Sequence, residues 1–158
     1  MSVQSASDLF EHELQDIYFA EHELTSAYER MADQTEDKGV QKFFEEHVDE
    51  TAGHIERLVE VFEETGEAPR PRSARGSRGC SPSGRSSSTE AETGPLLDYY
   101  NLVTAVKTER YEQSAYESLV DLAEHEGRSE AADLLRENLD EATLDDLVER
   151  VDEYDGFS

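Results

Sequence analysis

Residues 43–62, with the sequence FFEEHVDETAGHIERLVEVF, combine metal-binding side chains with a regular apolar pattern. If the segment is helical, His47, Glu50 and His54 are spaced i, i+3 and i+7 and lie on one face. That face runs beside an apolar stripe made of Phe44, Val48, Thr51, Ile55, Leu58 and Phe62. Two imidazoles and a carboxylate within two turns, next to a buried face, are typical of a helix that donates metal ligands into a bundle core.

Other segments with helical periodicity also carry carboxylates at or beside their apolar faces. Glu21, Glu109 and Glu141 lie on such faces, Glu112 lies one turn beyond the second of them, and Asp145 lies four residues beyond the third. Buried carboxylates cannot all stay ionised without partners, so they must take up protons or bind cations. We therefore expect a dinuclear metal site, with the candidate ligands Glu21, His47, Glu50, His54, Glu109, Glu112, Glu141 and Asp145. Carboxylates combined with imidazole suit iron, manganese or zinc.

An alternative interpretation is a bundle whose glutamates are simply solvated. The chain has 39 acidic residues among 158, so some of them fall on any helical stripe. Dinuclear carboxylate bundles usually carry a Glu-x-x-His pattern on two helices. Here the third residue after Glu50 is Gly53, and the last helical segment has no histidine.

Hydrophobic periodicity predicts four helices, at about residues 8–33, 40–64, 95–126 and 129–154. Pro95 suits the first turn of the third helix, and Gly127 separates the third helix from the fourth. Short links join the first helix to the second and the third to the fourth, which implies two antiparallel hairpins. We therefore predict an all-α, antiparallel four-helix bundle that forms a single domain over residues 1–158, with a long linker at 67–94 between its two hairpins.

The linker differs in composition from both of its flanks. Residues 68–89 contain no acidic residue and five arginines, mixed with serine, glycine and proline. Such a segment buries too little apolar surface to order itself, so we expect a disordered linker. Two alternatives are an arm that binds nucleic acid and a stretch that does not reflect the parent gene's reading frame. Cys80 lies in this segment, and as the single cysteine it excludes an intramolecular disulfide.

The charge of the chain argues against several classes of partner. Its formal net charge is −25, with 39 acidic and 14 basic side chains, and such a surface repels nucleic acid and anionic membranes. The acidic residues are spread along the chain, as expected for a halophilic protein whose self-repulsion is screened by high salt. There is no basic and apolar leader, nor a run of about 20 apolar residues that could span a membrane. We therefore expect a cytoplasmic protein.

Four stretches carry a resemblance to a known family: DLFEHELQDIYFAEHEL, FFEEHVDETAGHIERLVEVF, TERYEQSAYESLVDLAEHEG and LLRENLDEA. On these residues the chain resembles the YciF-like family of ferritin-like stress proteins. The resemblance implies a rubrerythrin-like four-helix bundle that forms a homodimer and holds a dinuclear metal site. It covers all four helices but not residues 68–94, where the family has an ordered helical segment.

The resemblance places ligands on the first two helices. The family's Tyr-x-Ala-Glu element matches residues 18–21 and points to Glu21. Its His-x-x-Glu-Thr element matches residues 47–51 and points to His47 and Glu50. The family often has glutamine near the position of His54, so this histidine is either an added ligand or a donor that supports a ligand.

The departures from the family pattern lie in the last two helices. The family's Glu-His-Tyr-Glu element matches residues 109–112, but Arg110 replaces the histidine, so no ligand is assigned at this position. The Leu-x-Glu-Glu element matches Leu139 and Glu141, and Ala142 follows where the family has another acidic residue. These changes weaken the second metal position and allow a site with one tight and one weak metal.

The resemblance implies an iron or manganese centre that reacts with dioxygen or peroxide, as a ferroxidase or a peroxidase in stress defence. The bridging ligands would be Glu50 and Glu141, and the remaining ligands Glu21 with His47 or His54, and Glu109 with Glu112. The alternative is a stress-associated helical dimer that holds no metal and catalyses nothing. Iron storage in a cage is a weaker candidate, because nothing in the sequence specifies a shell of many subunits.

Overall fold

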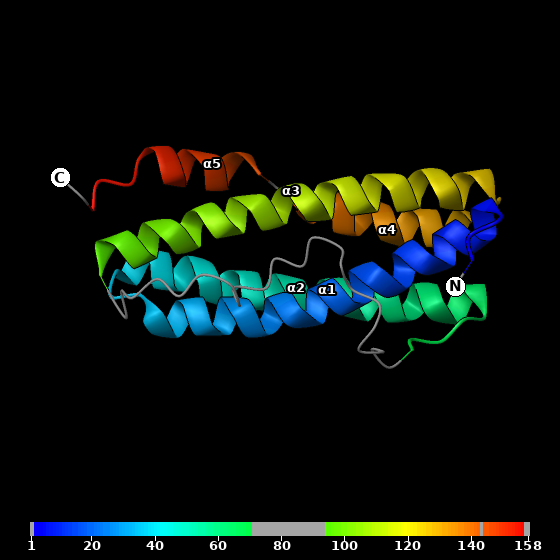
Figure 1. The fold of residues 1–158 in the computed structure, drawn as a ribbon, viewed down its shortest axis with the longest axis horizontal. Helices are drawn as coiled ribbons and strands as arrows, with labels where there is room; N and C mark the ends of the chain where they lie inside the picture. Colours follow the sequence, from blue (N-terminus) through cyan, green and yellow to red (C-terminus); the bar gives the residue numbers. More distant parts are fainter. Residues whose placement is uncertain (1, 71–93, 143, 157–158) are drawn as a thin grey trace.

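The computed structural model describes residues 2–70, 94–142 and 144–156, and these residues form helices and connections without any strand. The helices are α1 (Ala6–Gln34), α2 (Lys38–Thr65), α3 (Pro95–His125), α4 (Ser129–Glu141) and α5 (Asp145–Asp152), as Figure 1 shows. The first three agree with the predicted helices to within about two residues at each end, the usual uncertainty of a helix boundary.

Local chemistry explains where these helices begin and end. The Ser5 hydroxyl accepts a hydrogen bond from the backbone N–H of Asp8 at 3.1 Å and so caps α1. The Asp37 carboxylate caps α2 by accepting from the N–H groups of the second and third residues that follow it, at 2.8 and 3.0 Å. Gly66 ends α2 with a φ of 74°, a left-handed conformation that glycine adopts at little cost. Pro95 opens α3, as the sequence predicted.

The helices form the expected antiparallel bundle. Helices α1 and α2 make one antiparallel hairpin, and α3 and α4 make the second (Figure 1). Helices α2 and α3 run in the same direction along the bundle (Figure 1). Helix α1 packs on α2 and α3, and α4 packs on the same two helices, so α2 and α3 lie diagonally opposite each other. One long crossover between two helical hairpins is the ferritin-like arrangement, which confirms the predicted fold class.

The core consists of two apolar clusters with a polar layer between them. One cluster, near the start of α1 and the end of α2, contains Phe10, Leu14, Ile17, Leu58, Phe62, Tyr116, Leu119 and Leu135 among its buried members. The other, near the α1–α2 turn, contains Leu24, Tyr28, Phe43, Phe44, Leu102 and Leu147 among its buried members. The buried Glu21 of α1 follows Ala20 of the first cluster and precedes Leu24 of the second. The polar layer that contains Glu21 therefore lies between the two apolar clusters.

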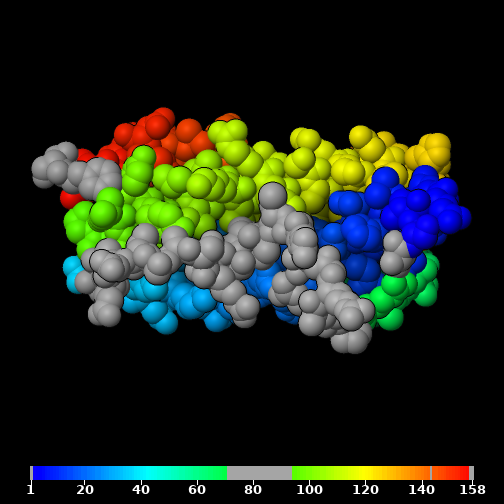
Figure 2. All heavy atoms as spheres, viewed as in Figure 1, coloured from blue at the N-terminus to red at the C-terminus, as the bar shows by residue number. Residues whose placement is uncertain are grey.

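The predicted fourth helix at 129–154 is wrong in one respect, because it is divided into α4 and α5. Helix α4 ends at Glu141, and the Ala142 carbonyl accepts a hydrogen bond from the Gln113 side-chain amide of α3 at 2.7 Å. This side chain satisfies a carbonyl that a continuing helix would have bonded within itself. The break offsets α5 along the N-terminal half of α3, and there the buried Leu147 joins the apolar cluster near the α1–α2 turn (Figures 1 and 2).

Only the ends of the predicted linker lie within the described residues. Arg70 pairs with Glu11 of α1, and its backbone N–H donates to the Gln15 side chain at 2.9 Å. The start of this segment is therefore joined to α1 by an ion pair and a hydrogen bond. Residues 71–93, including Cys80 and the other linker arginines, lie outside the described residues. No helix among the described residues is long and apolar enough to cross a membrane.

Candidate metal centre

The polar layer contains a group of three buried side chains from three helices: Glu21 of α1, His54 of α2 and Glu112 of α3. Each is at most 1% exposed, and each offers a potential ligand atom that lies within 4.8 Å of the other two. Glu21 Oε2 and Glu112 Oε1 are buried and have no hydrogen-bond partner. An unpaired buried carboxylate oxygen is costly. This group therefore has the burial, the donor types and the unsatisfied atoms of a cation site.

Tyr116 and Asn138 support this group from α3 and α4. The Tyr116 hydroxyl donates a short hydrogen bond of 2.5 Å to Glu21 Oε1. The fully buried Asn138 amide donates to the His54 backbone carbonyl at 3.2 Å and to the Tyr116 hydroxyl at 3.3 Å. The His54 ring in turn places Nδ1 3.2 Å from Glu21 Oε1. The Glu21 carboxylate is thus held by partners on α2 and α3, and Asn138 of α4 supports the Tyr116 hydroxyl and the backbone of His54.

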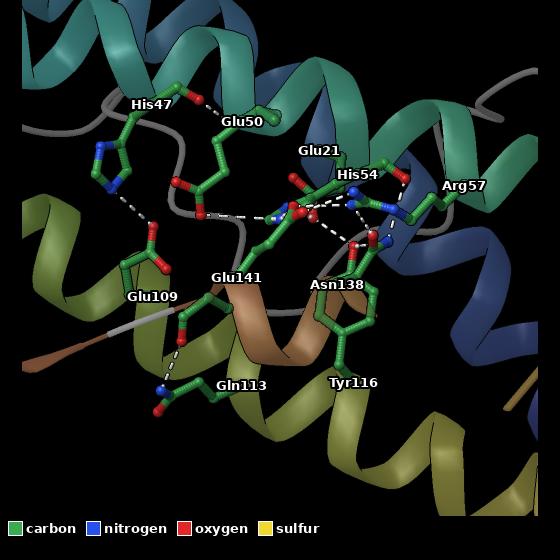
Figure 3. Close-up of polar contacts among 12 residues, drawn as sticks. Glu21, His47, Glu50, His54, Arg57, Glu109, Gln113, Tyr116, Asn138 and Glu141 are labelled. Carbon is green, nitrogen blue, oxygen red and sulfur yellow. Dashed lines mark hydrogen bonds and ion pairs between the residues drawn. The ribbon is translucent and has the colours of Figure 1, made fainter. Parts of the chain in front are cut away.

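A second group lies next to the first, toward the α1–α2 turn, and is formed by His47 of α2 and Glu109 of α3 (Figure 3). The His47 ring donates from Nδ1 to the Phe43 carbonyl at 3.0 Å, since a carbonyl can only accept. In the neutral ring Nε2 then carries a lone pair, and this atom lies 3.5 Å from Glu109 Oε1. Histidine ligands of metals are commonly fixed in this way by a backbone carbonyl. Glu109 Oε2 is buried without a hydrogen-bond partner, while Tyr28 donates to Oε1 at 3.3 Å.

Glu50 lies between the two groups on the shared face of α2 (Figure 3). Its Oε1 atom is 3.9 Å from His54 Nε2, and its side chain is 30% exposed. Its negative charge also contributes to the raised pKa of Glu109 in the second group. The predicted face with His47, Glu50 and His54 is therefore present, and it points into the polar layer.

Burial shifts the proton equilibria of these carboxyl groups in one direction. It raises the pKa of Glu109 to about 7, and the nearby negative charge of Glu50 adds to the effect. Burial also raises the pKa of Glu112 well above its ordinary range, with further contributions from Glu21 and Glu109. The pKa of Glu50 is raised by burial as well. In the metal-free protein the layer therefore holds protons that a bound cation would displace.

The two histidines shift in opposite directions. Burial lowers the pKa of His47, which keeps the ring neutral and its Nε2 lone pair available. Burial also opposes charge on His54, but its hydrogen bond to Glu21 and the charges of Glu21, Glu50 and Glu141 outweigh burial and raise its pKa. The raised pKa favours the protonated, positively charged ring of His54 in the metal-free protein, and metal binding at this ring requires the loss of that proton.

Glu141, a predicted ligand, is paired with Arg57 of α2. The Arg57 guanidinium contacts both Glu141 oxygens, at 2.8 Å through Nη1 and 2.6 Å through Nη2. The pKa of Glu141 is lowered mainly by this hydrogen-bonded pairing. Asp145 is exposed at the start of α5, beyond the break after α4, and the structure does not bring it to the polar layer.

A groove between α2 and α5 opens beside the second group. It has a volume of about 630 Å³, and both His47 and Glu50 line it. Its other charged lining residues are Asp37, Glu46, Asp146, Glu149, Arg150, Glu153 and Asp155. Because acidic residues dominate this lining, the groove attracts cations toward the end of the polar layer that holds Glu50.

Residues 5–151 match the sequence profile of a protein family described as a domain of unknown function, DUF892. The chain belongs to this family. Protein YciF of Escherichia coli (strain K12) is 32% identical to it over 148 residues, which cover 93% of this chain and 89% of that protein. The crystal structure of the E. coli stress protein YciF matches with a TM-score of 0.80 at 29% identity, over 96% of this chain and 98% of that chain. YcfI from Rhodopseudomonas palustris matches with a TM-score of 0.76 at 26% identity, over 96% of each chain. The predicted YciF-like resemblance is confirmed.

In this YciF-like chain, the structure brings together seven of the eight predicted ligands: Glu21, His47, Glu50, His54, Glu109, Glu112 and, at the border of the layer, Glu141, whose Oε2 lies 3.2 Å from His54 Nε2. Glu21 lies beside His54, which is one of the two predicted alternatives, whereas Glu112 joins this pair and Glu109 faces His47. Arg110 is exposed, in agreement with the absence of a ligand there.

Sequence reasoning missed two residues of the site, Arg57 and Asn138. Asn138 lies four residues after Leu134 and three after Leu135, and therefore on the apolar face of this helix. A polar amide on an apolar face was the sequence signal that could have identified it. Arg57 follows His54 by three positions and therefore shares its face. The tyrosines that donate to the carboxylates are Tyr28, to Glu109, and Tyr116, to Glu21.

Proposed function

We propose that this YciF-like protein binds a dinuclear iron or manganese centre in its polar layer and reacts with dioxygen or peroxide in the stress response. The observation that supports this most is the set of buried oxygens without hydrogen-bond partners: Glu21 Oε2, Glu109 Oε2 and Glu112 Oε1. They come from two helices, converge in mid-bundle and adjoin two imidazole rings. Such a donor set fits divalent iron or manganese.

The residues present would hold two ions in neighbouring positions. Glu21, His54 and Glu112 would bind one ion, His47 and Glu109 would bind the other, and Glu50 lies where it can reach both. The charges are compatible with this arrangement, since buried carboxyls that now retain protons would exchange them for metal charge. The bound metals would supply the redox chemistry, which these side chains do not provide by themselves.

The protein's own residues would perform three tasks in this function. The hydroxyls of Tyr28 and Tyr116 hold the carboxylates of Glu109 and Glu21 in position. The apolar clusters on both sides exclude water from the layer. The acidic groove beside Glu50 gives cations and small oxidants a route from solvent. The role in stress defence is taken from the E. coli stress protein YciF and is part of the proposal, as is assembly into a homodimer.

Metal content measured on protein purified in high salt without chelator tests the proposal. About two iron or manganese ions per chain are expected, as in dinuclear carboxylate bundles. Glu112→Gln keeps the size of a buried ligand while removing its charge, so this variant should lose at least one ion. Glu117→Gln, an exposed position on the same helix, is the matched control and should retain both ions. Absence of metal from the wild type, even after anaerobic addition of ferrous iron, would overturn the proposal.

A second candidate is a metal-free, structural helical dimer, and one observation favours it. Arg57 and a charged His54 already place positive charge beside Glu141 and Glu21, so part of the negative charge is balanced without metal. This candidate predicts a melting temperature that does not change when chelator is added. The metal centre predicts a lower melting temperature in chelator, because loss of a ligand that binds only the folded state removes stability.

A further inference from the structure

All three nitrogen atoms of the Arg57 guanidinium group contact side chains of α4. Its Nε lies 2.9 Å from Glu137 Oε2, and its Nη1 donates to Asn138 Oδ1 at 2.9 Å. Nη1 and Nη2 also contact the two oxygens of Glu141, at 2.8 and 2.6 Å (Figure 3). This paired contact with one carboxylate is among the strongest hydrogen-bonded ion pairs in proteins. The arginine is therefore held in one orientation by three polar side chains of α4 that lie within little more than one helical turn.

The pairing holds Glu141 at the border of the polar layer, with its carboxylate between Arg57 and His54. Glu141 Oε2 lies 3.2 Å from His54 Nε2, so the carboxylate is within reach of the first group. That contact lacks hydrogen-bond geometry, whereas both contacts to Arg57 have it. The Glu141 side chain is also 39% exposed, unlike the buried carboxylates of Glu21 and Glu112. Its lone pairs are thus committed to a fixed cation at the border of the site.

We propose that Arg57 is a built-in cation that withholds Glu141 from the metal, so that the ligands come from α1, α2 and α3 and metal affinity is limited by this ion pair. The inference rests on the proposed function, and it goes beyond it by assigning Arg57 as a positioning residue and by removing α4 from the ligand set. A metal ion in the first group would face the positive charge of Arg57 across Glu141. That repulsion weakens binding, and release of Glu141 would both add a ligand and remove the opposing charge.

Titration with manganese(II) alone, followed by the electron paramagnetic resonance of the free ion, gives both stoichiometry and affinity. Arg57→Met should bind the first manganese about tenfold more tightly, a size typical of changes beside a metal ligand. Glu141→Gln should leave the stoichiometry unchanged and the affinity within about threefold. The double variant R57M/E141Q should lose most of the gain seen in R57M, since the released carboxylate is absent. This non-additivity distinguishes a withheld ligand from a general charge effect.

Arg136→Met is the matched control, because Arg136 also pairs with acidic residues but does so on the exposed side of α4. It removes the same charge and should leave manganese affinity unchanged. Arg57→Lys provides a second variant if R57M folds poorly. Lysine keeps the charge but cannot make the paired contact, so this variant should show a smaller gain than R57M.

The outcomes separate this inference from the proposed function. Loss of a manganese ion in E141Q, with wild-type protein binding two, would overturn the role of Arg57 and leave the metal centre intact. Unchanged affinity in both R57M and R57K would overturn it as well. Manganese uptake by R57M but not by the wild type would support the role of Arg57 while overturning the proposed function. No uptake by any variant would overturn both.

Discussion

Replacing Glu109 by glutamine should stabilise the metal-free protein at high pH and have no such effect at low pH. Glu109 is 2% exposed, and burial together with the charge of Glu50 raises its pKa from 4.5 to about 7. In the unfolded chain this carboxyl loses its proton near its ordinary pKa, whereas in the folded protein it keeps the proton to about pH 7. The folded state therefore binds protons more tightly, and its stability must fall as the pH rises through this window.

The size of the effect follows from the two pKa values. Below pH 4.5 the carboxyl is protonated in both states, and above about pH 7 it is ionised in both, so stability changes only between these limits. At about 1.4 kcal/mol per pH unit, this interval corresponds to about 3 kcal/mol of lost stability. Glutamine carries no charge and its side-chain oxygen can still accept from Tyr28. E109Q should thus be about 3 kcal/mol more stable than the wild type at pH 8, and about equal to it at pH 4.5.

Urea unfolding followed by circular dichroism, at constant high salt with chelator, measures this difference between pH 4.5 and 8. Urea is chosen because guanidinium would change the ionic strength. Glu117→Gln on the exposed side of α3 is the control and should not change the pH profile. A difference between E109Q and the wild type that stays flat across this range would refute the reasoning. So would an E109Q variant that is less stable than the wild type at pH 8.

Three further predictions concern the surroundings of the site and the surface. Asn138→Ala removes a fully buried amide that bonds to His54, Tyr116 and Arg57, and should cost about 2–4 kcal/mol in urea unfolding; a cost below about 1 kcal/mol would contradict the assigned bonds. Tyr116→Phe removes the donor to Glu21 and should cost about 1–3 kcal/mol in the same measurement. The melting temperature should rise with added salt, because the net charge of −25 destabilises the compact state until salt screens it; a melting temperature independent of salt would argue against a halophilic protein.

The helices could be predicted from their hydrophobic periodicity, and the site could be located from the polar residues that interrupt this periodicity. Glu21 occupies a position on α1 where the pattern calls for an apolar residue, and it is fully buried. An isolated glutamate of this kind is ordinarily solvated, but His54, Glu109 and Glu112 break the apolar pattern at the same level of their own helices. The recurrence, and not any one residue, identified the polar layer.

The pairing of the ligands and the break after α4 were beyond sequence reasoning. Spacing shows which residues share a helical face, but the rotation of each helix against its neighbours decides that Glu112 meets Glu21 while Glu109 meets His47. No glycine or proline marks the end of α4, and the bond from Gln113 to the Ala142 carbonyl comes from another helix. Such a contact depends on tertiary packing, which overrides local propensity.

The connection of the two hairpins through a single crossover has a consequence for how the chain folds. Each hairpin can form from contacts between neighbouring segments, but the tyrosine–carboxylate bonds join Tyr116 to Glu21 across 95 positions and Tyr28 to Glu109 across 81. These bonds require the whole intervening loop to close, and that entropy is lost before the bonds can form. In a refolding experiment, helical circular dichroism should therefore recover before the tyrosine environment does. The centre is completed only in molecules in which the two halves have docked, so unassembled chains would not have a ready-made metal site.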